Sequence, residues 1–145
     1  SGRLAPPAPE AAERPPARRG RVLVVDDEPL VGRGIGRMLA RDHEVVVLTD
    51  AREALQRLAA GERFDLVLCD LMMPQMTGME LHRRLSQLAP AAAEQLVFMT
   101  GGAFTPSAEE FLAAGRRAVL AKPFDERALR ELASDRVARA AAAAT

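Results

Sequence analysis

The sequence contains one cysteine, no tryptophan, no tyrosine and no excess of either charge. Its single cysteine, Cys69, cannot form a disulfide within the chain. Twenty lysines and arginines balance twenty aspartates and glutamates, so no net field favours a polyanion, and nucleic-acid binding by this chain is not expected. Nothing resembles a signal peptide, and no run of about twenty apolar residues predicts a membrane span. These absences lead us to expect a cytoplasmic protein that does not enter a membrane.

The chain is predicted to hold one domain. A length of 145 residues allows one buried core and is too short for two substantial domains. Residues 1–19 contain five of the ten prolines, mixed with alanine, glutamate and arginine, and are predicted to be a linker. Residues 20–139 are predicted to be the domain, and residues 140–145 an alanine-rich C-terminal extension.

Five strand–helix units are predicted within the domain. Short apolar runs alternate with longer amphipathic stretches, a pattern typical of α/β folds. Most runs are apolar at successive positions, which indicates strands buried on both faces of a parallel sheet. The predicted strands are Arg21–Val25, Glu44–Leu48, Asp65–Cys69, Gln95–Met99 and Arg117–Ala121.

The helices are predicted from residues that favour helix starts. Pro29 suits the first turn of a helix, and Thr77 with Glu80 forms a capping-box pattern. Asp50 is expected to cap a helix that ends at Ala60. The last two helices are predicted to follow Thr105 and Asp125, the first of them short, at about 106–114, and the second beginning at Glu126.

Polar residues follow each predicted strand, and those after the second strand, Thr49 and Asp50, are better explained as a helix start. In an open doubly wound sheet, ligands bind outside the carboxyl ends of the strands, where the strand order reverses. A strand order of 2-1-3-4-5 would make strands one, three, four and five neighbours. Their polar ends would then converge on one pocket that contains Asp26, Asp27, Asp70, Thr100 and Lys122.

Phosphoryl transfer suits the chemistry of this group. Clustered carboxylates repel one another unless a cation is present, and Mg2+ (or Mn2+) prefers such oxygen ligands. Lys122 can pair with a phosphoryl oxygen, and the Thr100 hydroxyl can donate a hydrogen bond to another. A carboxylate can act as the nucleophile and form an aspartyl phosphate.

The same residues resemble the receiver domain of response regulators in two-component signalling. The motifs are Val-Val-Asp-Asp-Glu-Pro at 24–29, Cys-Asp-Leu-Met-Met-Pro-Gln-Met-Thr-Gly at 69–78, Met-Thr-Gly at 99–101 and Lys-Pro-Phe at 122–124. The resemblance covers residues 21 to about 139 and implies a flavodoxin-like receiver fold. It further implies phosphotransfer from a histidine kinase or a histidine phosphotransfer domain, with at most self-catalysed phosphotransfer and dephosphorylation by the domain itself.

The resemblance also implies a role for each site residue. Asp70 would accept the phosphoryl group, and the metal would be held by Asp26, Asp27, Asp70 and the carbonyl of Met72. Thr100 would be the switch hydroxyl. Lys122, followed by what is usually a cis peptide before Pro123, would bind the phosphoryl group. A dimer through the fourth helix, fifth strand and fifth helix is common in the family.

Three positions depart from the usual family pattern. Val119 stands where an aromatic residue often turns inward on activation, so we expect movement of the 101–104 loop and the short fourth helix to transmit the signal instead. Met72 and Gly102 stand where polar residues can position a water. Slow self-dephosphorylation is therefore predicted.

Other interpretations remain open. A pseudo-receiver would keep the fold without the chemistry, but the complete set of acids, hydroxyl and lysine argues against it. A phosphohydrolase of the dehalogenase type wants a second acid two residues after the first, whereas here Asp26 and Asp27 are adjacent and are followed by Glu28 and Pro29. The linker favours the receiver of a hybrid sensor histidine kinase over a free-standing regulator. Cys69 is expected to be a buried apolar residue, and His43 and His82 surface residues.

Overall fold

The computed structural model describes residues 19–101, 105–115, 118–122 and 125–144. Its strands are β1 (Arg21–Val25), β2 (Glu44–Leu48), β3 (Leu66–Asp70), β4 (Leu96–Thr100) and β5 (Val119–Ala121). Its helices are α2 (Pro29–Ala40), α3 (Ala51–Ala59), α4 (Gly78–Leu88), α5 (Pro90–Ala93), α6 (Pro106–Ala114) and α7 (Glu126–Ala144). The predicted linker lies almost entirely outside the described residues.

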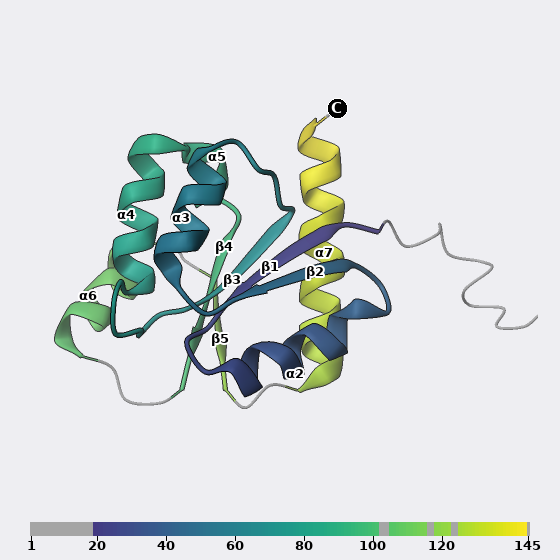
Figure 1. The fold of residues 1–145 in the computed structure, drawn as a ribbon, viewed down its shortest axis with the longest axis horizontal. Helices are drawn as coiled ribbons and strands as arrows, with labels where there is room; N and C mark the ends of the chain where they lie inside the picture. Colours follow the sequence, from purple (N-terminus) through teal and green to yellow (C-terminus); the bar gives the residue numbers. More distant parts are fainter. Residues whose placement is uncertain (1–18, 102–104, 116–117, 123–124, 145) are drawn as a thin grey trace, which may run out of the picture.

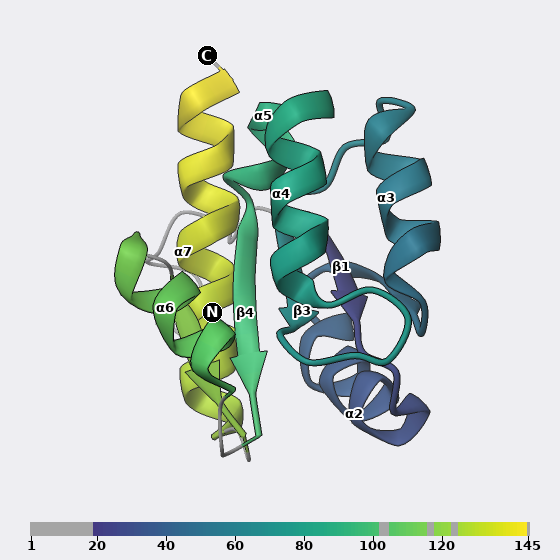
Figure 2. The ribbon, with the colours of Figure 1, turned by 90° about the vertical axis from the view of Figure 1, so that its left-hand side faces the viewer.

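The strands form one parallel sheet in the order β2-β1-β3-β4-β5, with helices on both faces (Figure 1). Leu23 and Phe98 belong to the core beneath α3, α4 and α6, whereas Val24 and Met99 belong to the core beneath α2 and α7. Figure 2 shows α6 and α4 on either side of β4. The predicted doubly wound α/β fold is confirmed, and the carboxyl ends of β1 and β3 are neighbours.

The five predicted helices begin where the sequence places their starts. Pro29 is the first residue of α2, and the Thr77 hydroxyl accepts a hydrogen bond from the Glu80 N–H at 3.1 Å. Side-chain oxygens cap three further helices in the same way, and at α7 the Asp125 carboxylate accepts from the Ala128 N–H at 3.1 Å. The Asp50 carboxylate accepts from the Arg52 N–H at 2.9 Å, and the Thr105 hydroxyl accepts from the Ala108 N–H at 3.1 Å.

The third and fourth strands lie one residue later than predicted. Backbone pairing continues through Asp70, which is in register with Met99, and the Leu71 N–H donates to the Met99 carbonyl at 3.0 Å. Asp65 lies before β3, and its carboxylate accepts a hydrogen bond from the Arg21 N–H at 2.9 Å. Asp70 and Thr100 are thus the last residues of their strands. Helix α3 ends at Ala59 rather than Ala60, and α5 is not predicted by the sequence pattern.

The prediction that His43 lies at the surface is wrong, because only 1% of its area is exposed. Its Nδ1 accepts a hydrogen bond from the Gly20 N–H at 3.1 Å, whereas its Nε2 has no hydrogen-bond partner among the described residues. Burial lowers the pKa of His43, and this shift is opposed by the charges of Asp42 and Asp65 and reinforced by Arg19. The ring is therefore a neutral part of the amino end of the sheet.

His82 also differs from the prediction, since it is half-buried with its ring against Phe98 and Phe111. Cys69 is fully buried as predicted, and burial raises the pKa of its thiol. Across the part of the chain that the structure describes, no helix combines the length and apolarity that a bilayer crossing requires.

Candidate functional site

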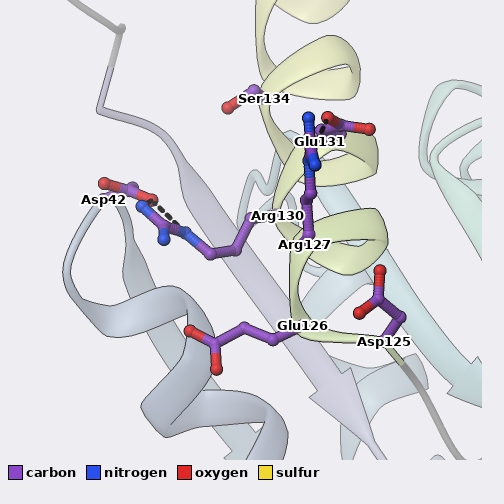
Figure 3. A pocket seen from close by; sticks show the side chains of 7 residues that line it. All are labelled: Asp42, Asp125, Glu126, Arg127, Arg130, Glu131 and Ser134. Carbon is purple, nitrogen blue, oxygen red and sulfur yellow. Dashed lines mark hydrogen bonds and ion pairs between the residues drawn. The ribbon is translucent and has the colours of Figure 1, made fainter. Parts of the chain in front are cut away.

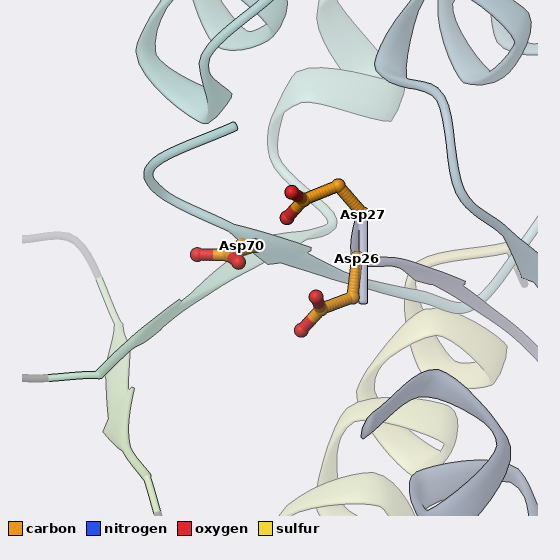
Figure 4. Close-up of side chains that lie close together, drawn as sticks. All are labelled: Asp26, Asp27 and Asp70. Atoms are coloured by element: carbon orange, nitrogen blue, oxygen red, sulfur yellow. The ribbon is translucent and has the colours of Figure 1, made fainter. Parts of the chain in front are cut away.

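Three aspartates meet at the carboxyl ends of β1 and β3 (Figure 4). Asp26 and Asp27 directly follow β1, and Asp70 ends β3. One carboxylate oxygen from each lies within 4.8 Å of the other two. Asp26 is fully buried, Asp70 is 7% exposed and Asp27 is half-buried. The three acidic residues singled out in the sequence therefore share one site.

Backbone hydrogen bonds orient two of these carboxylates. Asp26 Oδ1 accepts from the Glu28 N–H at 2.9 Å, and Asp70 Oδ1 accepts from the Met72 N–H at 3.2 Å. The Asp26 N–H in turn donates to the Leu48 carbonyl of β2 at 3.1 Å. Both side chains are therefore held by the backbone of the loops that follow their strands. The sequence pattern alone does not reveal these amide donors.

Lys122 reaches into the same site from the end of β5. Its Nζ lies 2.8 Å from Asp26 Oδ2 and 3.3 Å from Asp70 Oδ2. The Lys122 N–H donates to the Thr100 carbonyl at 2.7 Å, so the pairing of β5 with β4 positions the lysine. Thr100 itself is 7% exposed. All five polar residues predicted to converge lie at this edge of the sheet.

Gly78, the first residue of α4, allows close packing behind Asp70. A Cβ at Gly78 would lie 2.7 Å from the Asp70 carbonyl oxygen and 3.1 Å from Leu71 Cα. The Gly78 N–H donates to the Leu71 carbonyl at 2.9 Å, which closes the loop between β3 and α4. The sequence signals for this role are its position after the capping Thr77 and its place at the end of the motif at 69–78.

The electrostatics of the site favour a bound cation. Burial raises the pKa of Asp70, and the charge of Asp26 adds to this, whereas the Met72 N–H and Lys122 oppose it. Burial disfavours the charged form of Lys122, but its hydrogen bond to Asp26 and the charges of both carboxylates raise its pKa. Three carboxylates and one ammonium give a formal charge of −3 + 1 = −2. A hard divalent cation such as Mg2+ fits this charge and these oxygen donors.

Some predicted positions have no described counterpart. Gly102 and Pro123, with its predicted cis peptide, lie outside the described residues. Met72 is described, with 39% of its area exposed. Val119 begins β5 and is 41% exposed, so an inward-turning aromatic ring is absent at this described position.

A second charged hollow, of about 750 Å³, lies between the α2–β2 turn and the first turns of α7 (Figure 3). Arg130 donates to Asp42 Oδ2 at 2.9 and 3.1 Å, and Arg127 pairs with Glu131 at 3.4 Å. The Arg130–Asp42 pair joins α7 to the α2–β2 turn. Both arginines of the hollow are thus already paired with carboxylates. It offers no buried carboxylate cluster like that of Asp26 and Asp70 among its described lining residues.

Comparison with known proteins gives consistent matches. The sequence model of the response regulator receiver domain matches residues 22–134. The signal transduction histidine-protein kinase BarA of Escherichia coli is 32% identical over 111 residues, which make up 77% of this chain and 12% of BarA. The virulence sensor protein BvgS of Bordetella pertussis is 35% identical over 148 residues, covering 97% of this chain and 12% of BvgS. The chain thus spans a small part of these two relatives.

The fold has matches among solved structures as well. The crystal structure of a CheY-like response regulator receiver domain protein from Methanospirillum hungatei superimposes with a TM-score of 0.72 and 26% sequence identity. The match covers 85% of this chain and 97% of that chain.

Proposed function

The chain belongs to the response regulator receiver family of two-component signalling, and we propose that its Asp70 accepts the phosphoryl group. The observation that carries this proposal is the position of the Asp70 carboxylate, which lies beside Asp26 and Asp27 and 3.3 Å from Lys122 Nζ. A nucleophile, a candidate metal site and a cation for phosphoryl oxygens therefore lie together, as phosphoryl transfer requires.

In the proposed reaction, a carboxylate oxygen of Asp70 attacks phosphorus in line with the bond to a histidine nitrogen of the partner protein. The new P–O bond forms as the P–N bond breaks, and the nitrogen keeps the bonding pair and takes up a proton. Lys122 moves from carboxylate to phosphoryl oxygen, and the Thr100 hydroxyl donates to another. Phosphoryl transfer depends mainly on such positioning and charge stabilisation.

Receiver domains generally bind Mg2+ at an acidic cluster, and the donor set of this chain fits that ion. We assign the ligands as Asp26, Asp27, Asp70 and the carbonyl of Met72, with Mn2+ as an alternative to Mg2+. When bound, the ion supplies positive charge against the phosphoryl oxygens. Neither Met72 nor Gly102 has a polar side chain to position a water, which supports slow loss of the phosphoryl group.

The test is labelling with a small phosphodonor, acetyl phosphate, in the presence of Mg2+, followed by intact mass measurement. We expect one phosphoryl group on the wild type and none on Asp70→Asn. Asp135→Asn is the matched control, because Asp135 lies on the solvent side of α7, where it pairs only with Arg139 among the contacts described, and it should label as the wild type does. Equal labelling of Asp70→Asn would overturn the assignment.

The relatives support a wider context. Because BarA is named a signal transduction histidine-protein kinase and BvgS a virulence sensor protein, we propose that this chain is part of a hybrid sensor histidine kinase, in the cytoplasm where ATP supplies the phosphoryl group. The donor would be a kinase or phosphotransfer domain, with no nucleic acid or membrane bound by this chain. A homodimer through the face of α6, β5 and α7 fits the family. Sequencing the gene beyond both ends of the chain tests whether the chain is part of a hybrid kinase, since a free-standing regulator would lack a kinase region.

A further inference from the structure

We propose that Phe111 on α6 is a positioning residue that couples the state of the acid site to α6, through ring contacts with Phe98 and His82. The proposal rests on the proposed function of the site and concerns how phosphorylation is read. The signal would then pass through these rings and not through an inward-turning aromatic residue at position 119, where this chain has Val119.

Phe98 lies near two parts of the site, Thr100 at the end of β4 and the β3–α4 loop that follows Asp70. It precedes Thr100 by two residues in β4, so the alternation of side chains along a strand places both on the same face of the sheet. Phe98 is 1% exposed. A Cβ added to Gly78 would lie 3.3 Å from Phe98 Cδ1 and 2.7 Å from the Asp70 carbonyl oxygen. Phe98 therefore lies beside the start of α4 and on the same face of the sheet as Thr100, so we expect a shift of Thr100 or of the β3–α4 loop to reach this ring.

Three rings form one cluster around Phe98. The Phe98 and Phe111 ring centroids are 5.2 Å apart with the planes at 85°, an edge-to-face pair. His82 of α4 lies 5.4 Å from Phe111, also edge-to-face at 77°, and 6.1 Å from Phe98. Such arrangements have a preferred geometry beyond simple apolar contact. The position of Phe111 is therefore set by both β4 and α4.

Helix α6 has few other anchors. Of its residues, all of which the structure describes, only Ala108 is fully buried, while Phe111 and Leu112 are half-buried and the remainder exposed. Phe111 is the largest side chain that α6 packs against the core. Because so little else restrains the helix, displacement of Phe98 should move α6 as a unit.

Val119 is the register neighbour of Phe98 on β5. Its small side chain is 41% exposed, so it contributes no ring beside Phe98. The aromatic contacts of Phe98 described in the structure all lead to α4 and α6.

The physical content of the proposal is a coupling free energy between the acid site and α6. Such coupling is reciprocal, so weakening the attachment of α6 also changes the affinity of the site for a phosphoryl mimic. Spatial contact alone does not establish coupling, and the experiment must therefore measure the response of α6 itself.

The experiment records amide NMR shifts before and after addition of Mg2+ and beryllofluoride, a phosphoryl mimic. In the wild type, amides around Asp70 and amides of α6, such as those of Ala108 and Glu110, should shift. In Phe111→Leu the response of α6 should fall about fivefold or more, while that of the Asp70 region persists. Phe111→Tyr retains the ring and should restore the response. Phe64→Leu, a matched change at the other end of the sheet, should leave it unaltered.

The outcomes separate the two proposals. If α6 in Phe111→Leu responds as fully as in the wild type while the Asp70 amides shift, Phe111 is not the coupling residue and the inference is wrong. If the Asp70 amides of the wild type do not shift at all, the proposed function fails and the inference falls with it. Loss of the α6 response in Phe64→Leu would also overturn it, because the effect would then reflect general loosening of the core.

Discussion

Replacing Gly78 with alanine should destabilise the domain and impair phosphorylation of Asp70 together. The new Cβ would lie 2.7 Å from the Asp70 carbonyl oxygen and 3.1 Å from Leu71 Cα. Both are backbone atoms, which cannot rotate away as a flexible side chain can. Overpacking of this kind costs about 1–3 kcal/mol. Alanine gains about 0.5–1 kcal/mol over glycine in a helix interior, and less at the first residue of a helix, so we expect a net loss of about 1–2 kcal/mol.

The matched control is Gly34→Ala in the middle of α2. A Cβ at Gly34 meets nothing within 4 Å, so only the gain in helix propensity remains, about 0.5–1 kcal/mol of added stability. The two substitutions add the same methyl group and should change stability in opposite directions.

Urea unfolding followed by circular dichroism measures both changes, since a shift in midpoint at constant slope reports stability. Labelling by acetyl phosphate then measures the site, and Gly78→Ala should label more slowly than both Gly34→Ala and the wild type. If Gly78→Ala were as stable as the wild type and labelled at the same rate, the close approach of α4 to Asp70 would not support the site, and our reasoning would be refuted.

Two further predictions concern buried ionisable groups. Lys122→Met removes the cation that pairs with the fully buried Asp26, so the free energy of unfolding measured in urea should fall by about 1–3 kcal/mol and recover in part when Mg2+ is added. The control is Arg127→Met, which breaks an exposed pair and should change the free energy of unfolding by less than about 0.5 kcal/mol. Burial holds the pKa of His43 in the folded protein below its ordinary value of 6.5, so the imidazole is protonated more readily in the unfolded chain than in the folded protein. The stability that neutral His43 contributes should be complete above the ordinary pKa of 6.5 and should decline as the pH falls below it. The unfolding free energy of His43→Gln should therefore fall less than that of the wild type between about pH 7 and about pH 5. Identical pH profiles for the two proteins would contradict this.

Much of the fold could be predicted because local and global signals agree in this sequence. The continuous apolar runs of β1, β3 and β4 correspond to strands buried on both faces, whereas the edge strands β2 and β5 are only partly buried. Pro29, Asp50 and Thr77 begin helices for the reasons their chemistry suggests. The convergence of Asp26 and Asp70 follows from the strand order alone, once the sheet is known to be parallel.

Features that depend on contacts distant in sequence could not be predicted. His43 is buried, and its ring accepts a hydrogen bond from the N–H of Gly20, the residue before β1; nothing local to residue 43 indicates this. The one-residue shift of β3 reflects pairing of Asp70 with Met99. Helix α5 contains only four residues, Pro90–Ala93, too few to give a helical periodicity. In the site, the hydrogen bonds that backbone N–H groups donate to Asp26 and Asp70 depend on loop conformation rather than on side-chain type.

The central place of β1 has a mechanical consequence. This strand pairs with β2 along its length and with β3 from Val22 to Val25, both in parallel. A pull on the chain at Arg21 would act along the strand, so the hydrogen bonds on both sides would be loaded in shear and would resist together rather than opening one after another. Asp26 lies at the far end of that strand. Tension from a preceding segment should therefore be borne by the sheet before it disturbs the carboxylates.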